Sequence, residues 1–356
     1  MSPVFKMGVI GVGTMGKTHI QTCRVQENVE VVAIADINKE ILKSVSERFG
    51  IENAFTDYRD ILRMKEVEAV VICTPPFTHA KIACDAASAG KHILCEKPMA
   101  MNSREAEAMV KASRKAGVVL GICSARSRFS PHVELAKRYL SEGKLGRVYY
   151  ARFTMFRRRG RPGIDILKTS KWFIDSRKAG GGALIDIGCY DIDVLLYLMG
   201  SPQPASVSAV TFKGIEPTPS LESPFDVEEH STAFVRFEGG LTATFETAWA
   251  ANMENRNEVL ILGSKGGLRL NPFTYYTEKD GEQVSFGADL SSKRVPTMER
   301  LIEDFVNACV EDGSPKTPGE DGLKVMQIID MAYLSAKLGR EVTLKELQSS
   351  LNNLLP

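Results

Sequence analysis

The feature that most limits the possible folds of this chain is a glycine-rich segment directly after a short apolar run. The apolar run covers residues 4–10, a helical pattern covers about residues 14–26, and a second apolar run, residues 29–35, ends at Asp36. The glycines between the first run and the helix have the spacing GxGxxG and are Gly11, Gly13 and Gly16. A strand, a glycine turn, a helix and a second strand in this order predict the first half of a doubly wound parallel sheet.

The same segment predicts a dinucleotide site. Glycines allow a tight turn and a close approach to a pyrophosphate, the start of the helix offers N–H groups, and the Asp36 carboxylate can accept from a ribose diol. The predicted site residues are Gly11, Gly13, Thr14, Met15, Gly16 and Asp36. Asp36 would repel a 2′-phosphate and Ile37 stands where an NADP site would place an arginine, so NAD is favoured, while the nearby Lys39 leaves NADP open. The alternative is a turn without a ligand, in which Asp36 caps the helix at 38–49.

Strand and helix patterns continue to alternate up to about residue 123, which predicts a Rossmann fold. Ligands of such sheets bind beyond the carboxyl ends of the strands. Two strand ends are distinctive, because Thr74, Pro75 and His79 follow one, and Glu96 and Lys97 follow the next. We expect these five residues to lie at the cofactor. The alternatives are a capping or solvent-facing role for His79 and an ordinary loop lysine at Lys97.

A helix at residues 131–141 is followed by an alternating strand pattern at residues 147–156. After a further helix at 183–199 come short strand patterns without helices between them, at residues 206–212, 232–238, 241–248, 258–262 and 267–270. Such strands are typical of antiparallel sheets. We therefore predict a dinucleotide-binding domain over residues 1–125 and an α+β domain over residues 126–356. The second domain has an open, mainly antiparallel sheet and two closing helices at 298–310 and 322–338.

The composition argues against several classes of partner. Lys and Arg total 45 against 44 Asp and Glu, and this net charge of +1 does not indicate binding to nucleic acid or to an anionic membrane. No apolar stretch approaches the roughly 18–20 residues of a membrane span, and residues 1–6 show no signal-peptide pattern, so we expect a cytoplasmic protein. The seven cysteines are scattered without a CxxC pair, which predicts reduced thiols, no disulfide framework and no metal site.

Taken together, the motifs resemble those of the Gfo/Idh/MocA family of oxidoreductases over nearly the whole chain. The carriers are GVGTMG at 11–16, TPP at 74–76, EKP at 96–98, RFSP at 128–131 and GGGALIDIGCYDID at 180–193. In this family the lysine of EKP is catalytic, and a later DxGxH segment supplies an aspartate and a histidine. The resemblance therefore implies that Lys97 and Asp186 are catalytic. Tyr190 stands at the position of the family's histidine, so it is the third implied catalytic residue and departs from the family pattern. It also implies a homodimer or a homotetramer.

The segment after the triple glycine indicates a site by its own pattern as well. Apolar residues recur with helical spacing over residues 183–199. Asp186, Tyr190 and Asp193 stand at i, i+4 and i+7, so we expect them on one helical face as a polar stripe toward the cofactor. The alternative is a first-turn carboxylate favoured by the helix dipole and a buried tyrosine whose hydroxyl is satisfied.

The missing histidine bears on the mechanism. When a secondary alcohol is oxidised, a hydride leaves carbon while a base takes the hydroxyl proton, and histidine is the natural base near neutral pH. A tyrosine can replace it if a neighbouring ammonium group lowers its pKa from about 10. The dimeric dihydrodiol dehydrogenases of the family are similar in having tyrosine at this place. We predict that Lys97 polarises the reacting oxygen, Tyr190 exchanges the proton and Asp186 holds substrate hydroxyls.

Two further residues are candidates for substrate binding. Arg126 belongs to an arginine-rich region whose centre is a cluster of Arg157, Arg158, Arg159 and Arg161. This region predicts either a clamp for a carboxylate or phosphate on the substrate, or a solvated loop or salt bridges at a subunit interface. Trp172 is expected to form a wall for a sugar ring or to belong to the core.

The predicted function is that of an NAD(P)-dependent dehydrogenase acting on a secondary hydroxyl of a sugar, polyol or cyclic diol. Two alternatives stay open. One is a glycoside hydrolase that oxidises its substrate transiently. The other is a dinucleotide sensor without turnover, similar to the fungal galactose-regulon repressors of the family.

Overall fold

The computed structural model describes residues 4–218, 224–290, 292–293 and 295–352, and the chain divides into two compact units. Unit 1 comprises Met1–Arg126 and Pro296–Leu323, and unit 2 comprises Ser127–Val295 and Lys324–Pro356. The first change of unit falls one residue beyond the predicted boundary. Residues 296–323, which the sequence pattern places in the second domain, belong instead to unit 1.

Packing and backbone pairing explain why residues 296–323 belong to unit 1. Helix α9 (Thr297–Val310) buries the apolar side chains of Leu301, Ile302, Phe305 and Val306. Further along, the backbone N–H of Ile122 donates to the carbonyl of Thr317 at 3.0 Å, which attaches the segment to the edge of the first sheet. An amphipathic helix shows by its pattern that one face is buried, but not against which domain.

Unit 1 is built on a six-stranded sheet in the order β3-β2-β1-β4-β5-β6, and all its strand pairs are parallel. The strands are β1 (Phe5–Ile10), β2 (Val29–Ala35), β3 (Asn53–Phe55), β4 (Ala69–Ile72), β5 (His92–Cys95) and β6 (Leu120–Ile122). The strand order reverses between β1 and β4, where a crevice forms beyond the carboxyl ends of the strands in folds of this type. The predicted Rossmann fold is confirmed.

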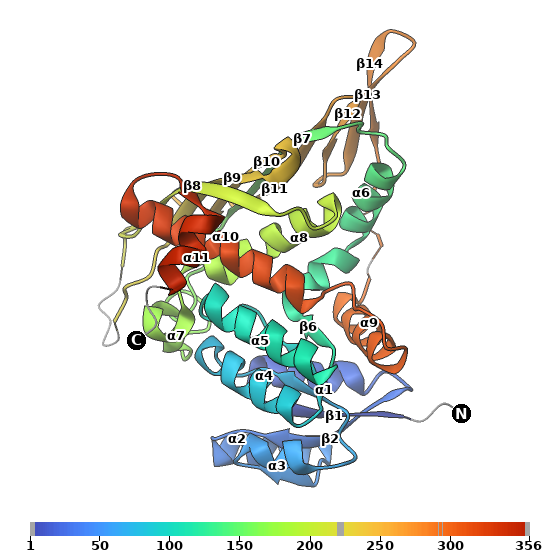
Figure 1. Cartoon of the computed structure of the whole chain (residues 1–356), viewed down its shortest axis with the longest axis vertical. Coiled ribbons are helices and arrows are strands. Elements are labelled where there is room, and N and C mark those ends of the chain that lie inside the picture. Colours follow the sequence, from blue (N-terminus) through green and yellow to red (C-terminus); the bar gives the residue numbers. More distant parts are fainter. Residues whose placement is uncertain (1–3, 219–223, 291, 294, 353–356) are drawn as a thin grey trace. The chain divides into compact units, whose positions relative to one another are not determined.

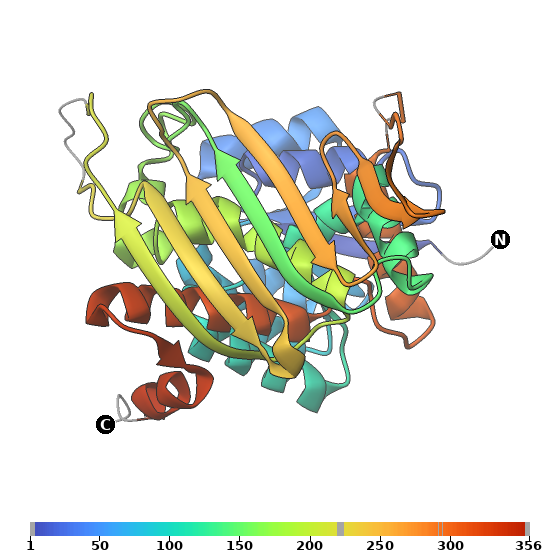
Figure 2. The same ribbon diagram turned by 90° about the horizontal axis from the view of Figure 1, so that it is seen from above.

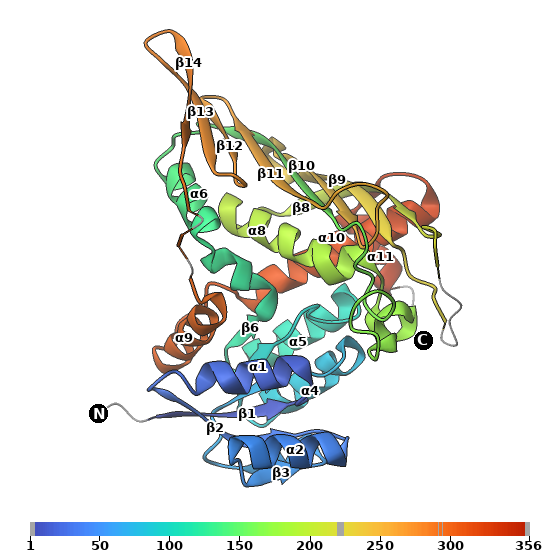
Figure 3. The ribbon, with the colours of Figure 1, turned by 180° about the vertical axis from the view of Figure 1, so that it is seen from behind.

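Helices cover both faces of this sheet. Figures 1 and 3 show α4 and α5 on one face and α1 with α9 on the other. The helices between the strands are α1 (Thr14–Cys23), α2 (Lys39–Phe49), α3 (Tyr58–Arg63), α4 (His79–Ser88) and α5 (Ser103–Ala116). Coverage on both faces explains why strands such as β4 are apolar at every position.

Unit 2 is built on a nine-stranded sheet in the order β14-β13-β12-β11-β7-β10-β9-β8-β15. The strands are β7 (Val148–Phe156), β8 (Pro204–Phe212), β9 (His230–Phe237), β10 (Thr242–Ala248), β11 (Arg256–Gly263), β12 (Gly266–Arg269), β13 (Thr274–Lys279), β14 (Glu282–Gly287) and β15 (Val342–Thr343). Neighbouring strands are antiparallel except for β7 and β10, which are parallel. The predicted open, mainly antiparallel sheet is confirmed.

Figure 2 looks onto this sheet, with α8 (Cys189–Met199) and α10 (Gly319–Leu338) behind it. The boundary between the two units falls within α10. The remaining helices of unit 2 are α6 (Pro131–Ser141), α7 (Ser176–Ala179) and α11 (Leu344–Asn352). Within the described ranges, no helix is both long enough and apolar enough to cross a membrane. All seven cysteines are free thiols.

Candidate active site

Two of the three glycines in the loop between β1 and α1 are required by internal packing. Gly11 has φ +88°, and a Cβ there would lie 2.8 Å from the carbonyl carbon of Cys73. A Cβ on Gly16 would lie 2.0 Å from the carbonyl oxygen of Gly11. Both positions therefore need glycine, since the helix and the neighbouring strand end approach the loop too closely for any side chain.

Gly13 differs, because a Cβ there would meet no atom of the chain within 4 Å. The space beside it is open to a ligand. Gly13 is the N-cap of α1, has no side chain to cap the helix, and the first turn contains no acidic residue. The N–H groups and the positive end of the helix dipole are thus available to an anion. The loop fits the pyrophosphate of a dinucleotide.

Asp36 is held against this loop. Its Oδ2 accepts the backbone N–H of Val12 at 2.9 Å, and its Oδ1 accepts that of Asn38 at 2.8 Å. The alternative in which Asp36 caps α2 is wrong, because the side chain of Asn38 accepts the first free N–H groups of that helix. The carboxylate is therefore oriented by the glycine loop, and each oxygen keeps a lone pair for a ribose hydroxyl.

The loop after β4 places Thr74 and Pro75 in partly exposed positions, whereas His79 is fully buried. The ring nitrogens of His79 lie 3.0 Å from the carbonyl oxygen of Pro98 and 2.6 Å from that of Thr74. Burial lowers the pKa of this histidine. His79 therefore connects the loop after β4 to the loop after β5. The prediction that it contacts the cofactor is not supported, because its side chain is buried.

Lys97 follows β5 and is partly exposed between the buried residues Glu96 and Pro98. Glu96 is only 4% exposed, so its carboxylate is not open to a cofactor as predicted. It accepts the backbone N–H of Lys97 and lies 2.9 Å from the His19 imidazole. Burial alone would raise the pKa of Glu96, but the hydrogen bond from His19 and the charges of His19, Arg126 and Lys97 lower it to about 2. The catalytic candidate therefore stands beside a buried, ionised carboxylate.

In unit 2, the triple glycine allows close backbone contacts. A Cβ on Gly181 would lie 2.0 Å from the Tyr333 hydroxyl oxygen, and one on Gly182 would lie 1.9 Å from the carbonyl oxygen of Glu228. The Glu228 carboxylate accepts the backbone N–H groups of Gly182 and Leu184 at 2.8 and 2.9 Å. Glu228 thus caps the segment that begins after the glycines, and the sequence pattern contains no sign of this role.

The segment itself differs from the single α-helix predicted over residues 183–199. A π-helical turn, η4 (Leu184–Gly188), precedes α8. Asp186 lies in this turn and is 7% exposed, and its Oδ2 accepts the indole N–H of Trp249 at 2.9 Å. Trp249 is fully buried in a cluster with Ala183, Ile187 and Val227. A buried indole needs an acceptor for its N–H, so this bond fixes the Asp186 carboxylate.

The predicted polar stripe is corrected at Asp193. The guanidinium of Arg128 donates to both carboxylate oxygens of Asp193 at 2.9 and 2.7 Å, and each side chain is 2% exposed. Both carboxylate oxygens of Asp193 are therefore bound in a buried bidentate ion pair, and this side chain cannot face a ligand. Tyr190 lies in the first turn of α8, where its side chain is partly buried.

The other substrate candidates have mixed surroundings. Arg126 belongs to unit 1, where its Nη1 lies 3.9 Å from Oε1 of Glu96. Trp172 is partly exposed and stacks on Phe173 with ring centroids 3.7 Å apart. Within the arginine cluster, Arg161 is buried and donates to Asp165 and Glu229. Arg161 is therefore held in a buried ion-pair network within the chain, which differs from both interpretations of the cluster.

Asp191, next to Tyr190, is expected to make stability depend on pH. Burial raises its pKa from 3.8 to about 7. The folded state therefore holds this proton more tightly, so the stabilisation is complete below about pH 4 and is lost as the pH rises to about 7. We expect Asp191→Asn to stabilise the protein at pH 8 by up to about 4 kcal/mol and to change little at pH 4. Urea unfolding at both pH values measures this, with Asp280→Asn on an exposed turn as the control. Equal effects at the two pH values would contradict the prediction.

Comparison with known proteins fits this geometry. A family of oxidoreductases with an NAD-binding Rossmann fold matches residues 5–124, and the GFO/IDH/MocA C-terminal domain matches residues 133–269. The chain belongs to the Gfo/Idh/MocA family. The resemblance predicted from the motifs is thus confirmed, and residues 5–124 are an NAD-binding domain of the oxidoreductase type.

Relatives align over nearly their full length. Levoglucosan dehydrogenase of Pseudarthrobacter phenanthrenivorans is 30% identical, with 93% of this chain and 95% of the relative covered. D-glucoside 3-dehydrogenase of Escherichia coli is 27% identical, with 96% and 98% covered. A solved structure of levoglucosan dehydrogenase with NADH and levoglucosan has a TM-score of 0.84 at 28% identity and covers 96% of this chain and 99% of that one. The members of the Gfo/Idh/MocA family most similar to this chain thus include sugar dehydrogenases.

Proposed function

We propose that the protein is an NAD-dependent dehydrogenase that oxidises a secondary hydroxyl of a pyranose sugar or a related cyclic polyol, or reduces the corresponding ketone. One observation carries the proposal. Lys97 follows β5 at the same carboxyl edge of the sheet as the open glycine loop after β1, with only β4 between the two strands. A cation at the edge where the dinucleotide binds suits a reaction that develops negative charge on oxygen.

The names of the relatives support the substrate class. Levoglucosan and D-glucosides, which appear in those names, are cyclic sugars with secondary ring hydroxyls. This chain covers almost all of both relatives and has Lys97, Asp186 and Tyr190 at the positions of the family motifs, which suits the same substrate class. Anionic sugars are less well supported, because Arg161, one candidate for an anion clamp, is taken up by Asp165 and Glu229.

Each residue has a distinct proposed role. NAD, when bound, accepts the hydride that leaves the carbinol carbon. Lys97 donates a hydrogen bond to the reacting oxygen and stabilises its negative charge, while Tyr190 receives the hydroxyl proton and passes it to solvent. Asp186, fixed by Trp249, accepts hydrogen bonds from neighbouring substrate hydroxyls. The products are a keto sugar, NADH and a proton, so atoms and electrons balance.

The test is the absorbance of reduced nicotinamide with NAD or NADP and a panel of levoglucosan, methyl glucosides, inositols and free aldoses. Turnover of a cyclic secondary alcohol with NAD supports the proposal and identifies the substrate series. Release of an aglycone from a nitrophenyl glycoside without net reduction of the cofactor would indicate the hydrolase alternative. Tight NAD binding with neither reaction would indicate the sensor alternative, and either result would overturn the proposal.

Asp36 is expected to determine cofactor choice. Asp36→Ala removes an acceptor for the ribose hydroxyls, so the KM for NAD should rise at least about tenfold, since hydrogen bonds to charged groups contribute about 1.5–3 kcal/mol. Ile37 is 90% exposed next to this carboxylate, and the double variant Asp36→Ser/Ile37→Arg should therefore favour NADP. The ratio of kcat/KM for the two cofactors measures both effects, with the exposed Lys43→Ala on α2 as the control. A wild-type protein that prefers NADP would contradict the prediction.

We also propose that the chain forms a homodimer or homotetramer, as the family resemblance implies. Exposed apolar side chains on the nine-stranded sheet support this, because their burial by a second copy would be favourable. They include Val210, Phe212, Leu262, Tyr276 and Phe286. Sedimentation at micromolar concentration should give a mass at least twice that of the chain. A single monomeric species would contradict the proposal.

A further inference from the structure

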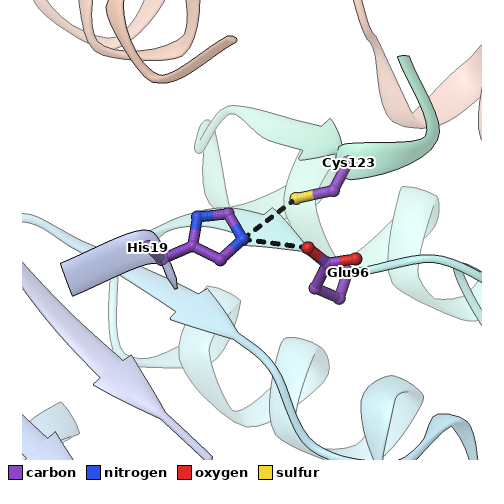
Figure 4. Close-up of side chains that lie close together, drawn as sticks. All are labelled: His19, Glu96 and Cys123. Atoms are coloured by element: carbon purple, nitrogen blue, oxygen red, sulfur yellow. Dashed lines mark hydrogen bonds and ion pairs between the residues drawn. The ribbon is translucent and has the colours of Figure 1, made fainter. Parts of the chain in front are cut away.

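A buried contact in unit 1 joins helix α1 to the loop that carries Lys97. His19 lies on α1 and Glu96 follows β5, and the imidazole Nε2 is 2.9 Å from Oε1 of Glu96. The sulfur of Cys123, directly after β6, lies 3.9 Å from the same nitrogen. Figure 4 shows Nε2 facing both of these side chains. All three side chains are buried, so water does not compete for these contacts.

Both carboxylate oxygens of Glu96 are used within the protein. Oε1 is bound to His19, and Oε2 accepts the backbone N–H of Lys97 at 3.1 Å. Because an ionised carboxylate can only accept hydrogen bonds, Nε2 of His19 must be the donor. The imidazole is therefore connected through one carboxylate to the backbone of the proposed catalytic lysine.

The other ring nitrogen of His19 gives evidence of a different kind. Nδ1 is buried and has no hydrogen-bond partner among the described residues. A buried polar atom without a partner costs about 1–3 kcal/mol, so an apolar side chain would suit the packing of α1 better. Of the two ring nitrogens, Nε2 is therefore the one whose polar contacts its surroundings use, within the part of the chain that the structure describes.

The three side chains could also be considered as metal ligands, because their ligand atoms lie within 4.8 Å of one another. A metal would need a thiolate and an imidazole lone pair at this point. Nε2 of His19 and Oε1 of Glu96 stand at the hydrogen-bond distance of 2.9 Å, and the Cys123 sulfur lies 3.9 Å from the same nitrogen. The geometry is that of a hydrogen-bonded cluster, and a stoichiometric metal ion in the purified protein would contradict this interpretation.

We propose that His19 is a positioning residue for Lys97: its Nε2–H holds Glu96 in the one orientation in which the second carboxylate oxygen binds the Lys97 backbone. The inference rests on the proposed function, in which Lys97 contacts the reacting oxygen. An imidazole on the cofactor-binding helix thereby sets where the lysine stands.

Two amide substitutions separate the two ring nitrogens. Gln in His19→Gln places an N–H near the position of Nε2, whereas the shorter amide in His19→Asn reaches only the position of Nδ1. Both variants bury a polar amide of similar character in the same space. Cys123→Ala is the matched control, since it removes the neighbouring side chain of the cluster without removing a hydrogen bond to Glu96.

We expect His19→Asn to lower kcat by about 10²-fold with KM for sugar and NAD nearly unchanged, because a small misplacement of a catalytic group costs about that much. His19→Gln should recover most of this loss, and Cys123→Ala should stay close to the wild type. Equal losses in His19→Asn and Cys123→Ala would indicate a packing role and overturn the inference. A His19→Gln variant no better than His19→Asn would also overturn it, as would a stoichiometric metal ion in the purified protein.

Crystal structures of the two amide variants test the same inference without any turnover. In His19→Asn, Oε2 of Glu96 should leave the Lys97 N–H, and in His19→Gln this bond should remain. An unchanged loop in His19→Asn would refute the positioning role. Failure of the proposed function gives a different result. The wild type would then turn over no substrate, while the bond between Glu96 Oε2 and the Lys97 N–H would still be lost in His19→Asn and kept in His19→Gln.

Discussion

Replacing Lys97 by methionine is expected to lower kcat by about 10²- to 10³-fold while NAD binding stays nearly unchanged. Methionine keeps the length and much of the volume of lysine but has no N–H donor and no charge. The variant therefore cannot stabilise the negative charge that develops on the reacting oxygen. Lys97 is partly exposed and its neighbours Glu96 and Pro98 are buried, so the loop should keep its place.

Two measurements separate this effect from a structural one. NAD affinity, from quenching of protein fluorescence, should be similar in wild type and Lys97→Met, because the glycine loop and Asp36 are unaltered. Lys81→Met is the matched control, since Lys81 is an exposed lysine of the same unit that pairs with Asp85 on α4. Loss of activity in both variants, or turnover of Lys97→Met within a few-fold of wild type, would contradict the assignment.

The elements that the sequence predicts well are those whose own residues carry the signal. The bounds of β2 and α6 follow from apolar periodicity and, for α6, from the Ser130 cap, all of which are local. The glycine loop is local too, because Gly11 and Gly16 are needed by contacts within one strand–helix unit. These features fix the cofactor domain before any long-range contact is known.

The parts that the sequence does not predict depend on partners far away in the chain. His19 contacts Glu96 across 77 positions, and Trp249 contacts Asp186 across 63. Neither His19 nor Trp249 belongs to a motif that names its partner. Strands β13 and β14 were missed for another reason, because most of their side chains are exposed and show no clear apolar alternation.

The π-helical turn η4 is not predicted by the sequence for a third reason. Over five residues, apolar spacing does not distinguish a helix of 3.6 residues per turn from a wider one. The wider turn depends on Glu228. This residue lies so close to Gly182 that no residue type other than glycine fits at position 182. Asp186 lies in this π-helical turn, so the α-helical spacing that would place it on one face with Tyr190 and Asp193 does not apply to it. The motif that singles out Asp186 does not depend on this periodicity, whereas the argument from helical spacing is incorrect.

The second large effect on kcat is expected at Tyr190, which stands where the family usually has histidine. Tyr190→Phe removes only the hydroxyl, and we expect kcat to fall by about 10²- to 10⁴-fold, the usual contribution of a positioned acid or base. The ring remains, so the first turn of α8 should keep its packing and the free energy of unfolding should change little. A melting temperature close to that of the wild type would show that the loss belongs to the chemistry.

Tyr190→His makes the test specific, because it restores the residue type usual in the family. Free histidine titrates near pH 6.5 and free tyrosine near pH 10, so the two proton acceptors differ by about 3.5 pKa units. If Tyr190 takes the proton, the histidine variant should keep substantial activity, and the rising limb of its kcat profile should lie at lower pH than in the wild type. Identical pH profiles would mean that another group takes the proton. A histidine variant as inactive as Tyr190→Phe would mean that the reaction needs the phenol itself, because its hydroxyl reaches further from the backbone than an imidazole nitrogen.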